Sequence, residues 1–297
     1  MVSSVDLPIC TACGTQFDDT TVKNCHICDD PRQFIPISGQ SFTSLSKLRA
    51  QSYSNKFKPF DSDNRFISIW TEPKLAIGQR CVLLRTPAGN VLWDCITYLD
   101  DATVNTIQDM GGIAAIVISH PHYYSTHLEW AAAFGCKVYV AADDAQWLCR
   151  RDEVVVRSFV QDTEHEIQIA GVGSGVKALK LGGHFPGSLV CLWEGRLLVA
   201  DTLVTVPSGL YHVDRPAGTS SFAFMWSIPN MIPLGPDAML GMWRVLKKYS
   251  FGSTHGAFVG LDIIAKDVKE WVLESMKIQC RSEEYKDHPL LKETCEL

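Results

Sequence analysis

The sequence contains no apolar run of about 20 residues, the length that a membrane-spanning helix needs. It also has no excess of basic residues, because the formal net charge is −6 at pH 7. A chain with this charge has no general attraction for nucleic acid or for an anionic membrane surface. We therefore expect neither a membrane protein nor a nucleic-acid-binding protein. The expected partner is a small-molecule substrate, and the sequence leaves the oligomeric state open.

The first residues also lack a basic segment followed by an apolar core, so we expect no secretory signal. The eleven cysteines are an odd number, which is not typical of a disulfide framework. Buried free thiols instead indicate a reducing compartment, and the cytoplasm is the expected location. Seven cysteines are scattered in apolar context or near the end of the sequence: Cys81, Cys95, Cys136, Cys149, Cys191, Cys280 and Cys295.

The remaining four cysteines form two C-x-x-C pairs, Cys10 with Cys13 and Cys25 with Cys28. Each pair makes a knuckle whose two thiolates face one ion, and two knuckles complete a tetrahedral site. So short a segment buries too little apolar surface to fold alone. Metal binding would supply the folding free energy, on the order of 10–16 kcal/mol in small zinc peptides. The spacing resembles a zinc ribbon or rubredoxin-like knuckle over residues 1–35. We expect structural Zn²⁺, although four cysteines also accept iron.

A second cluster of candidate ligands lies in residues 119–127, which contain three histidines. An unbroken apolar run at 113–118 precedes them and predicts a buried strand, and residues 128–134 predict a helix. His120 and His122 are spaced as H-x-H on the intervening turn, so their rings can point at one place. Divalent transition metals bind neutral imidazoles arranged in this way. The alternative is that these histidines are hydrogen-bonded core residues.

The rest of the sequence predicts an α/β domain. Residues 36–65 are polar and irregular and are expected to be a connector, 66–280 form the main domain, and 281–297 form a charged tail. We expect a loop covering a pocket at 221–235. Strands are expected at 66–70, 78–86, 91–95, 113–118, 137–141, 154–171, 175–181, 189–193 and 196–200. Helices are expected at 102–110, 128–134, 143–150, from 236 onward, and at 262–278.

Three further polar residues follow predicted strands: His184, Asp201 and His255. Their order and spacing resemble the metallo-β-lactamase superfamily over about residues 66–278. Residues 183–188, Gly-His-Phe-Pro-Gly-Ser, resemble that family's G-H-x-P-G-S turn. Residues 200–203, Ala-Asp-Thr-Leu, resemble its G-D-T-L segment, and Asp94 ends a strand as in the family. The resemblance implies an αββα sandwich whose metal ligands lie on loops at one edge.

The sequence departs from the family at the second metal position. The family's turn usually reads H-x-H-x-D-H, and its D-H pair serves the second metal. Here Tyr124 and Ser125 occupy those two places. The second position would then retain only Asp201 and His255, with His127 as a substitute two residues beyond the usual place.

The first metal position, in contrast, keeps its ligands, His120, His122 and His184, with Asp201 beside them. We therefore expect one well-occupied metal and a second site that is weak, rebuilt or absent. Zn²⁺ is the expected ion, and Fe²⁺ or Mn²⁺ would also fit this set of ligands.

Three imidazoles and one open coordination position are typical of catalytic zinc, which lowers the pKa of bound water to about 7. Asp201 would orient this water and accept its proton. The phenol of Tyr124 could hydrogen-bond a substrate oxygen. The resemblance thus implies a hydrolase of an ester, thioester, lactone or amide that uses a metal-bound hydroxide. It is more similar to the glyoxalase II and lactonase branches than to true β-lactamases.

Two alternatives stay open at this point. Two histidines and one carboxylate on one metal form the facial triad of non-haem iron oxygenases. The superfamily's persulfide dioxygenase branch uses such a centre, and His120, His184 and Asp201 could supply it. The other alternative is a zinc-ribbon interaction protein without catalysis.

Overall fold

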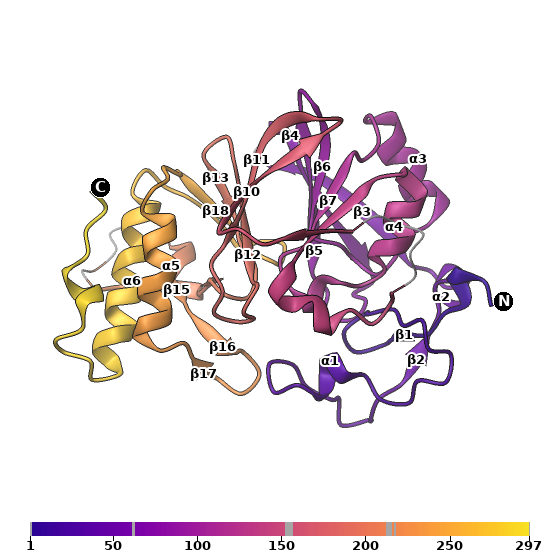
Figure 1. Cartoon of the computed structure of the whole chain (residues 1–297). Coiled ribbons are helices and arrows are strands. Elements are labelled where there is room, and N and C mark those ends of the chain that lie inside the picture. Colours follow the sequence, from indigo (N-terminus) through magenta and orange to yellow (C-terminus); the bar gives the residue numbers. More distant parts are fainter. Residues whose placement is uncertain (1, 61–62, 152–156, 212–215, 217, 297) are drawn as a thin grey trace. The chain divides into compact units, whose positions relative to one another are not determined.

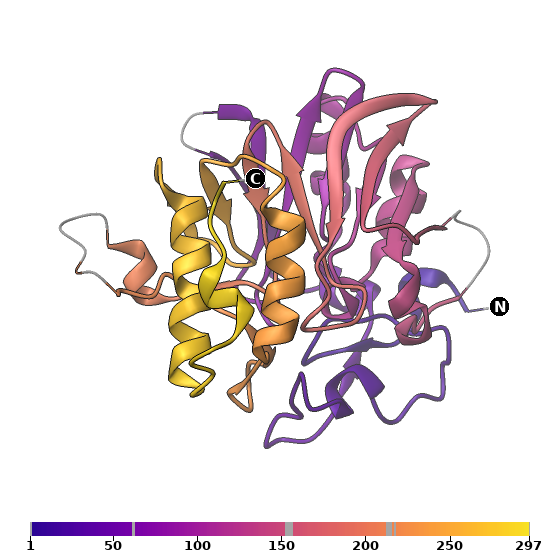
Figure 2. The same cartoon turned by 60° about the vertical axis from the view of Figure 1, so that its left-hand side comes forward.

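The computed structural model describes residues 2–60, 63–151, 157–211, 216 and 218–296. The chain divides into two compact units. Unit 1 comprises Met1–Gln161 and Glu166–Val176, and unit 2 comprises Asp162–His165 and Lys177–Leu297. Both units contain a sheet and helices, which Figures 1 and 2 show from two directions.

Unit 1 begins with a segment that has little regular structure. Its strands β1 (Ile9–Cys10) and β2 (Phe42–Thr43) pair antiparallel. The helices are η1 (Ser4–Asp6), α1 (His26–Asp29) and α2 (Leu45–Arg49). The four cysteines of the two C-x-x-C pairs form a small buried core with Phe17 and Ile27. So small a core is typical of a segment that a metal ion holds together.

The main sheet of unit 1 has seven strands in the order β3-β4-β5-β6-β7-β8-β9. Strands β3 to β6 pair antiparallel, and β6 to β9 pair parallel. The apolar run at 113–118 contains β7, and every residue of that strand is buried, as expected inside a parallel sheet. The strands are β3 (Ser54–Phe60), β4 (Asp63–Glu72), β5 (Arg80–Thr86), β6 (Gly89–Trp93), β7 (Ala115–Val117), β8 (Lys137–Ala141) and β9 (Arg157–Val160).

Two expectations for this part of the chain need correction. The sheet begins at β3, inside the segment that was expected to be an irregular connector. The expected helix at 143–150 is a 3-10 helix, η3 (Ala142–Trp147). The strand expected at 154–171 begins with residues that lie outside the described part of the chain, and its remainder contains β9 and β10 (Glu164–Ile169).

The helices of unit 1 begin and end at residues that suit helix termini. Helix α3 (Asp101–Asp109) has the Asp100 carboxylate as its N-cap, accepting from Thr103 N at 2.8 Å. Helix α4 (His127–Phe134) ends at Gly135, whose φ of 64° suits glycine. Helix α4 contacts β7 and β8 of the main sheet (Figure 1). The turn before α4 therefore starts directly at the carboxyl end of β7.

A second sheet has the order β10-β11-β12-β13-β18-β19. Strands β12, β13, β18 and β19 belong to unit 2, whereas β10 and β11 have residues in both units. Strand β13 pairs parallel with β18, because the chain crosses over between them. Strand β19 lies at the start of the helix that was expected at 262–278, so the helix begins later, at Val268. The strands are β11 (Val172–Lys180), β12 (Leu189–Trp193), β13 (Arg196–Leu198), β18 (Ser253–His255) and β19 (Asp262–Ile264).

Two long helices complete unit 2, α5 (Pro236–Leu246) and α6 (Val268–Ser282), and they lie side by side in both views (Figures 1 and 2). Pro236 opens α5 at the first helical position, where its missing N–H costs nothing. Trp243 and Met276 are fully buried between the helices and the sheet core. Leu290, in the segment expected to be a charged tail, is also fully buried in this core.

Short elements occupy the stretch between β13 and α5. They are β14 (Val204–Thr205), η4 (Pro207–Leu210), β15 (Phe222–Ala223), β16 (Met225–Ser227) and β17 (Ile232–Pro233). The segment expected to be a loop at 221–235 therefore contains two small pairings, β14 with β15 and β16 with β17. Among the described residues, every helix is too short or too polar to cross a membrane.

Candidate metal centres

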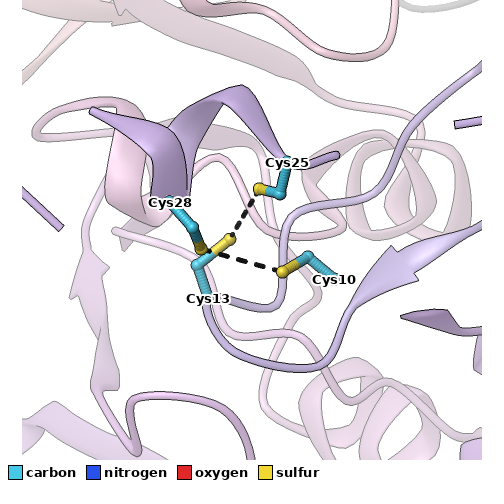
Figure 3. A group of neighbouring side chains, drawn as sticks. All are labelled: Cys10, Cys13, Cys25 and Cys28. Carbon is cyan, nitrogen blue, oxygen red and sulfur yellow. Dashed lines mark hydrogen bonds between the residues drawn. The ribbon is translucent and has the colours of Figure 1, made fainter. Parts of the chain in front are cut away.

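The four-cysteine cluster has the geometry of a tetrahedral metal site. The Sγ atoms of Cys10 and Cys28 are 3.7 Å apart, and those of Cys13 and Cys25 are 3.6 Å apart (Figure 3). All four sulfurs lie within 4.8 Å of one another. A tetrahedron with Zn–S bonds of about 2.3 Å has sulfurs about 3.8 Å apart, which matches these distances.

The charge state of this cluster also points to a cation. The neighbouring thiols, Cys13 first, lower the pKa of Cys10 strongly. The contact with Cys10 is the main cause that raises the pKa of Cys13, Cys25 and Cys28. One thiolate is thus stabilised by the other three thiols, and further ionisation is opposed by its negative charge. A divalent cation removes that opposition, so four buried thiolates fit a bound metal.

The cysteine segment is hydrogen-bonded to the loops around the histidine turn. The backbone N–H of Gln16 donates to the Ser125 carbonyl at 3.0 Å. The Thr97 hydroxyl donates to the Gly14 carbonyl at 3.2 Å. A Cβ at Gly14, whose φ is 81°, would lie 1.9 Å from Thr97 Oγ1, so this close approach requires glycine. The backbone after Cys13 is therefore fixed against the turn.

The opposite side of the cysteine segment packs on η3 and the residues after it. His26 stacks on Trp147 with ring centroids 5.9 Å apart, and burial lowers the pKa of His26. The Arg150 guanidinium bonds to Gln16 Oε1 at 2.6 Å and also pairs with Glu129 of α4. Arg150 thus connects the cysteine segment to helix α4 within unit 1.

Asp94 holds the start of the histidine turn, a role that the sequence did not reveal. Its carboxylate accepts from the backbone N–H of Ser119 at 2.7 Å, and Asp94 is only 2% exposed. Asp94 has φ of 63°, which directs its side chain from the end of β6 toward the end of β7. In the sequence, Asp94 is recognisable only as an aspartate at the end of a strand. Its hydrogen-bond partner, Ser119, lies 25 positions later in the chain.

His120 and His122 are brought together by this turn. Both are buried, and their ring centroids are 5.0 Å apart. Nδ1 of His120 is hydrogen-bonded to Ser119 Oγ at 2.9 Å, so Nε2 is the nitrogen with which His120 can bind a metal. Unit 1 therefore presents two neighbouring imidazoles.

His184 and Asp201 are brought together in unit 2. Thr202 connects them, because its hydroxyl donates to the Gly182 carbonyl at 2.9 Å and accepts from the His184 N–H at 3.3 Å. Gly182 and Gly183 both have positive φ, which the tight turn requires. Nε2 of His184 is 3.7 Å from Asp201 Oδ2.

The second nitrogen of His184 decides its tautomer. Nδ1 lies 2.8 Å from the carbonyl oxygen of Trp226, which can only accept, so Nδ1 carries the proton. In the neutral ring, Nε2 then presents a lone pair toward a carboxylate oxygen at a distance beyond hydrogen-bond range. A cation, either a proton or a metal, fits between two such atoms. The Trp226 carbonyl is the second positioning group that the sequence did not reveal.

His127 and Tyr124 have other partners within unit 1. His127 Nδ1 donates to the Tyr124 carbonyl at 2.7 Å, and its Nε2 accepts from Arg157 Nε at 3.2 Å. The hydroxyl of Tyr124 donates to the carbonyl of Asp144 at 3.1 Å, and burial raises the pKa of Tyr124. As placed here, His127 offers no lone pair to a metal, and the Tyr124 hydroxyl is used inside unit 1.

His255 is likewise committed within unit 2. Nδ1 lies 2.9 Å from Asp262 Oδ1, and Nε2 lies 3.0 Å from Ser253 Oγ. These partners come from the paired strands β18 and β19, which hold the ring on both sides. The expected second-site ligand is thus placed in a Ser-His-Asp chain of hydrogen bonds.

Solved structures define the class of fold. The DIM-1 metallo-β-lactamase exposed to ceftazidime is 10% identical, with a TM-score of 0.52, over 77% of this chain and 98% of that chain. VMB-1 at pH 5.5 is 14% identical, with a TM-score of 0.51, over 77% of this chain and 98% of that chain. At these identities the likeness concerns the fold alone. The chain has the metallo-β-lactamase fold preceded by a four-cysteine segment, as the sequence predicts.

A relative of similar length gives the family. The chain is 35% identical over 277 residues to the uncharacterized protein YmaE of Bacillus subtilis strain 168. The alignment covers 91% of this chain and 92% of YmaE, so the chain belongs to the YmaE family. No model of a known protein family matches the chain.

Proposed function

We propose that the protein is a metal-dependent hydrolase of an ester, thioester, lactone or amide with one catalytic metal. His120, His122 and His184 would bind this metal, with the carboxylate of Asp201 beside it. The observation that carries the proposal is the His184–Asp201 pair, in which a fixed lone pair faces a carboxylate at 3.7 Å. Three imidazoles suit zinc and leave one coordination position open for water.

The positions of the other candidate ligands support a single metal. His127 and His255 use both ring nitrogens in hydrogen bonds. The hydroxyl of Ser125, where the family usually has histidine, donates to the Cys95 carbonyl at 3.3 Å. A second metal would have to break several of these buried hydrogen bonds, at a cost of about 1–3 kcal/mol for each group left unsatisfied.

The bound metal would polarise the carbonyl oxygen of the substrate and acidify a water molecule. Asp201, whose side chain is 14% exposed, can hold that water and accept its proton. His184 is kept in one tautomer and orientation by the Trp226 carbonyl, and His120 is oriented by Ser119. These residues therefore supply orientation and proton transfer at the reacting carbonyl.

We also propose that the four-cysteine site binds a structural zinc that braces the histidine turn. The hydrogen bonds from Gln16 to Ser125 and from Thr97 to Gly14 support this role. They connect the backbone beside Cys13 to both loops around His120 and His122. No nucleic-acid or protein partner is needed to explain the segment.

The test is the metal content per chain of three purified proteins: the natural chain, the double variant Cys10→Ser with Cys13→Ser, and His184→Asn. We expect about two zinc ions in the natural chain and about one in each variant. A screen of esters, thioesters, lactones and amides should then show activity that His184→Asn loses. Asp201→Asn should retain more metal than His184→Asn and still lose activity, because it keeps the three imidazoles but not the base.

Other results would support the alternatives. Iron that remains in the double cysteine variant, together with oxygen uptake on thiol substrates, would replace hydrolysis by an oxygenase reaction. Zinc that is found only at the cysteines, with no activity in any assay, would favour an interaction protein. Both outcomes contradict the proposed hydrolase.

A further inference from the structure

An apolar cavity within unit 2 opens beside Asp201. Its volume is about 100 Å³, and its walls come from the turn after Asp201, the β16–β17 hairpin and the turn after β18. The side chains that form its apolar surface are those of Leu203, Val204, Ile228, Ala257, Phe258 and Leu261. The described polar side chains that reach the lining are those of Asp201 and Thr205. A cavity of this kind is typical of a site that orients a ligand by one polar group and binds its apolar part.

The cavity walls are fixed in place. Leu203 is fully buried and Ala257 is 9% exposed. The backbone N–H of Gly256 donates to the Leu261 carbonyl at 2.9 Å, which closes the turn after β18. A Cβ at Gly256 would lie 2.9 Å from Leu261 Cβ, so glycine permits this close approach. The shape of the cavity is therefore a property of the folded unit.

We infer that this cavity binds the apolar side chain of the substrate's acyl group, and that this side chain has three or four carbon atoms. The inference rests on the proposed function, since Asp201 is the residue assigned to the attacking water. Two groups are bonded to the reacting carbonyl carbon: the acyl side chain, through carbon, and the leaving group, through a heteroatom. The lining next to Asp201 is apolar, which suits the acyl side chain. A water-sized unit occupies about 30 Å³, and a cavity of about 150 Å³ binds benzene, so 100 Å³ suits a propyl, isopropyl or isobutyl group.

The test uses the metal-loaded protein and 4-nitrophenyl esters of acetic, butyric, isovaleric and octanoic acids. We expect kcat/KM for the isovalerate to exceed that for the acetate at least tenfold, because each methylene in a fitted pocket contributes a factor of about 10 or more. The octanoate should be a poor substrate. A second series of acetates with different alcohols should show no such dependence. A preference that follows the alcohol would overturn the inference.

Two variants change the cavity in opposite directions. Ala257→Leu fills it and should bring the isovalerate-to-acetate ratio close to one. Ile228→Ala enlarges it at a position that is already 38% exposed, and should shift the preference toward longer chains. Ala102→Leu, an equal change on the exposed surface of α3, is the control and should leave the ratio unchanged. Unchanged ratios in both cavity variants would overturn the inference.

A binding measurement separates this inference from the proposed reaction. Isovalerate should raise the melting temperature of the metal-loaded protein more than acetate does, and Ala257→Leu should abolish the difference. If no ester is hydrolysed but this binding pattern holds, the hydrolase proposal fails and the cavity assignment stands. If esters are hydrolysed without chain preference and acetate and isovalerate bind equally, the cavity assignment is wrong and the hydrolase proposal stands.

Discussion

The hydrogen bonds of each histidine ring determine whether that ring can bind a metal. In His184 the Trp226 carbonyl takes up the Nδ1 proton, so Nε2 is left to face Asp201. In His255 both nitrogens have partners, Asp262 and Ser253, in the same sheet. Two histidines that look equivalent in the sequence therefore differ in the structure, since only His184 directs a nitrogen at a carboxylate beyond hydrogen-bond range.

We predict that His255→Asn leaves the metal content of the chain unchanged, whereas His184→Asn removes one metal. The reason is that His255 is placed in a Ser-His-Asp hydrogen-bond chain rather than in the ligand set. His255 is 2% exposed, so its loss should still lower the free energy of unfolding by about 1–3 kcal/mol. Elemental analysis and urea unfolding of both variants measure the two effects separately.

A loss of metal in His255→Asn equal to that in His184→Asn would show a second metal position. Asp262→Asn is a matched control, because it disturbs the same hydrogen-bond chain without removing an imidazole. It should lower stability and keep the metal content of the natural chain.

At the scale of elements, local signals in the sequence predicted many of the strands and helices. Strand β8 matches its expected bounds, since five residues rich in β-branched side chains are followed by polar residues. The sequence predicts helix α4 because Gly135 follows a run of residues that favour helices. The order of His120, His122, His184 and Asp201 predicted the fold class from short motifs.

The features that the sequence did not reveal depend on strand pairing or on contacts outside the local segment. Strand β3 is an edge strand with two lysines and a proline, which protect an edge but hide the strand pattern. Strand β19 is three residues long and exists because it pairs with β18. The role of Asp94 depends on a backbone N–H 25 positions away. Pairing with the neighbouring strand decides β3 and β19, and only the role of Asp94 depends on a residue far along the chain.

The cysteine segment gives a prediction at this scale. Cys13→Ser should abolish metal binding at the four-cysteine site and increase hydrogen exchange of the amides in residues 119–127 at least tenfold. The physical reason is that Gln16 and Gly14 lose their fixed positions and release Ser125 and Thr97. Hydrogen exchange with mass spectrometry, at equal zinc concentration, measures the change.

Cys295→Ser, at a partly exposed cysteine outside the cluster, is the control and should exchange like the natural chain. The amides of α5 and α6 serve as an internal reference, because they belong to unit 2. Rapid exchange in residues 9–28 with an unchanged histidine turn would mean that the four-cysteine segment does not brace the turn.

At the scale of the whole molecule, the candidate ligands of the proposed metal lie far apart in the sequence, from His120 to His184. Binding of this metal would therefore stabilise the folded arrangement of the segments that carry these ligands. A ligand that binds only the folded state stabilises it by about 4 kcal/mol at a free concentration of 1,000 times its Kd. Removal of this metal should therefore change cooperativity as well as stability.

We predict that the metal-loaded chain unfolds in one transition and that His184→Asn, which keeps the cysteine zinc, unfolds in two. Differential scanning calorimetry counts the transitions. Variants that lack tryptophans of one unit can assign each transition to a unit by fluorescence. Unit 2 contains four of the eight tryptophans: Trp193, Trp226, Trp243 and Trp271. Excess zinc should merge the transitions of the metal-depleted natural chain but not those of His184→Asn. If the natural chain with and without metal shows the same transitions, the proposed set of ligands is wrong.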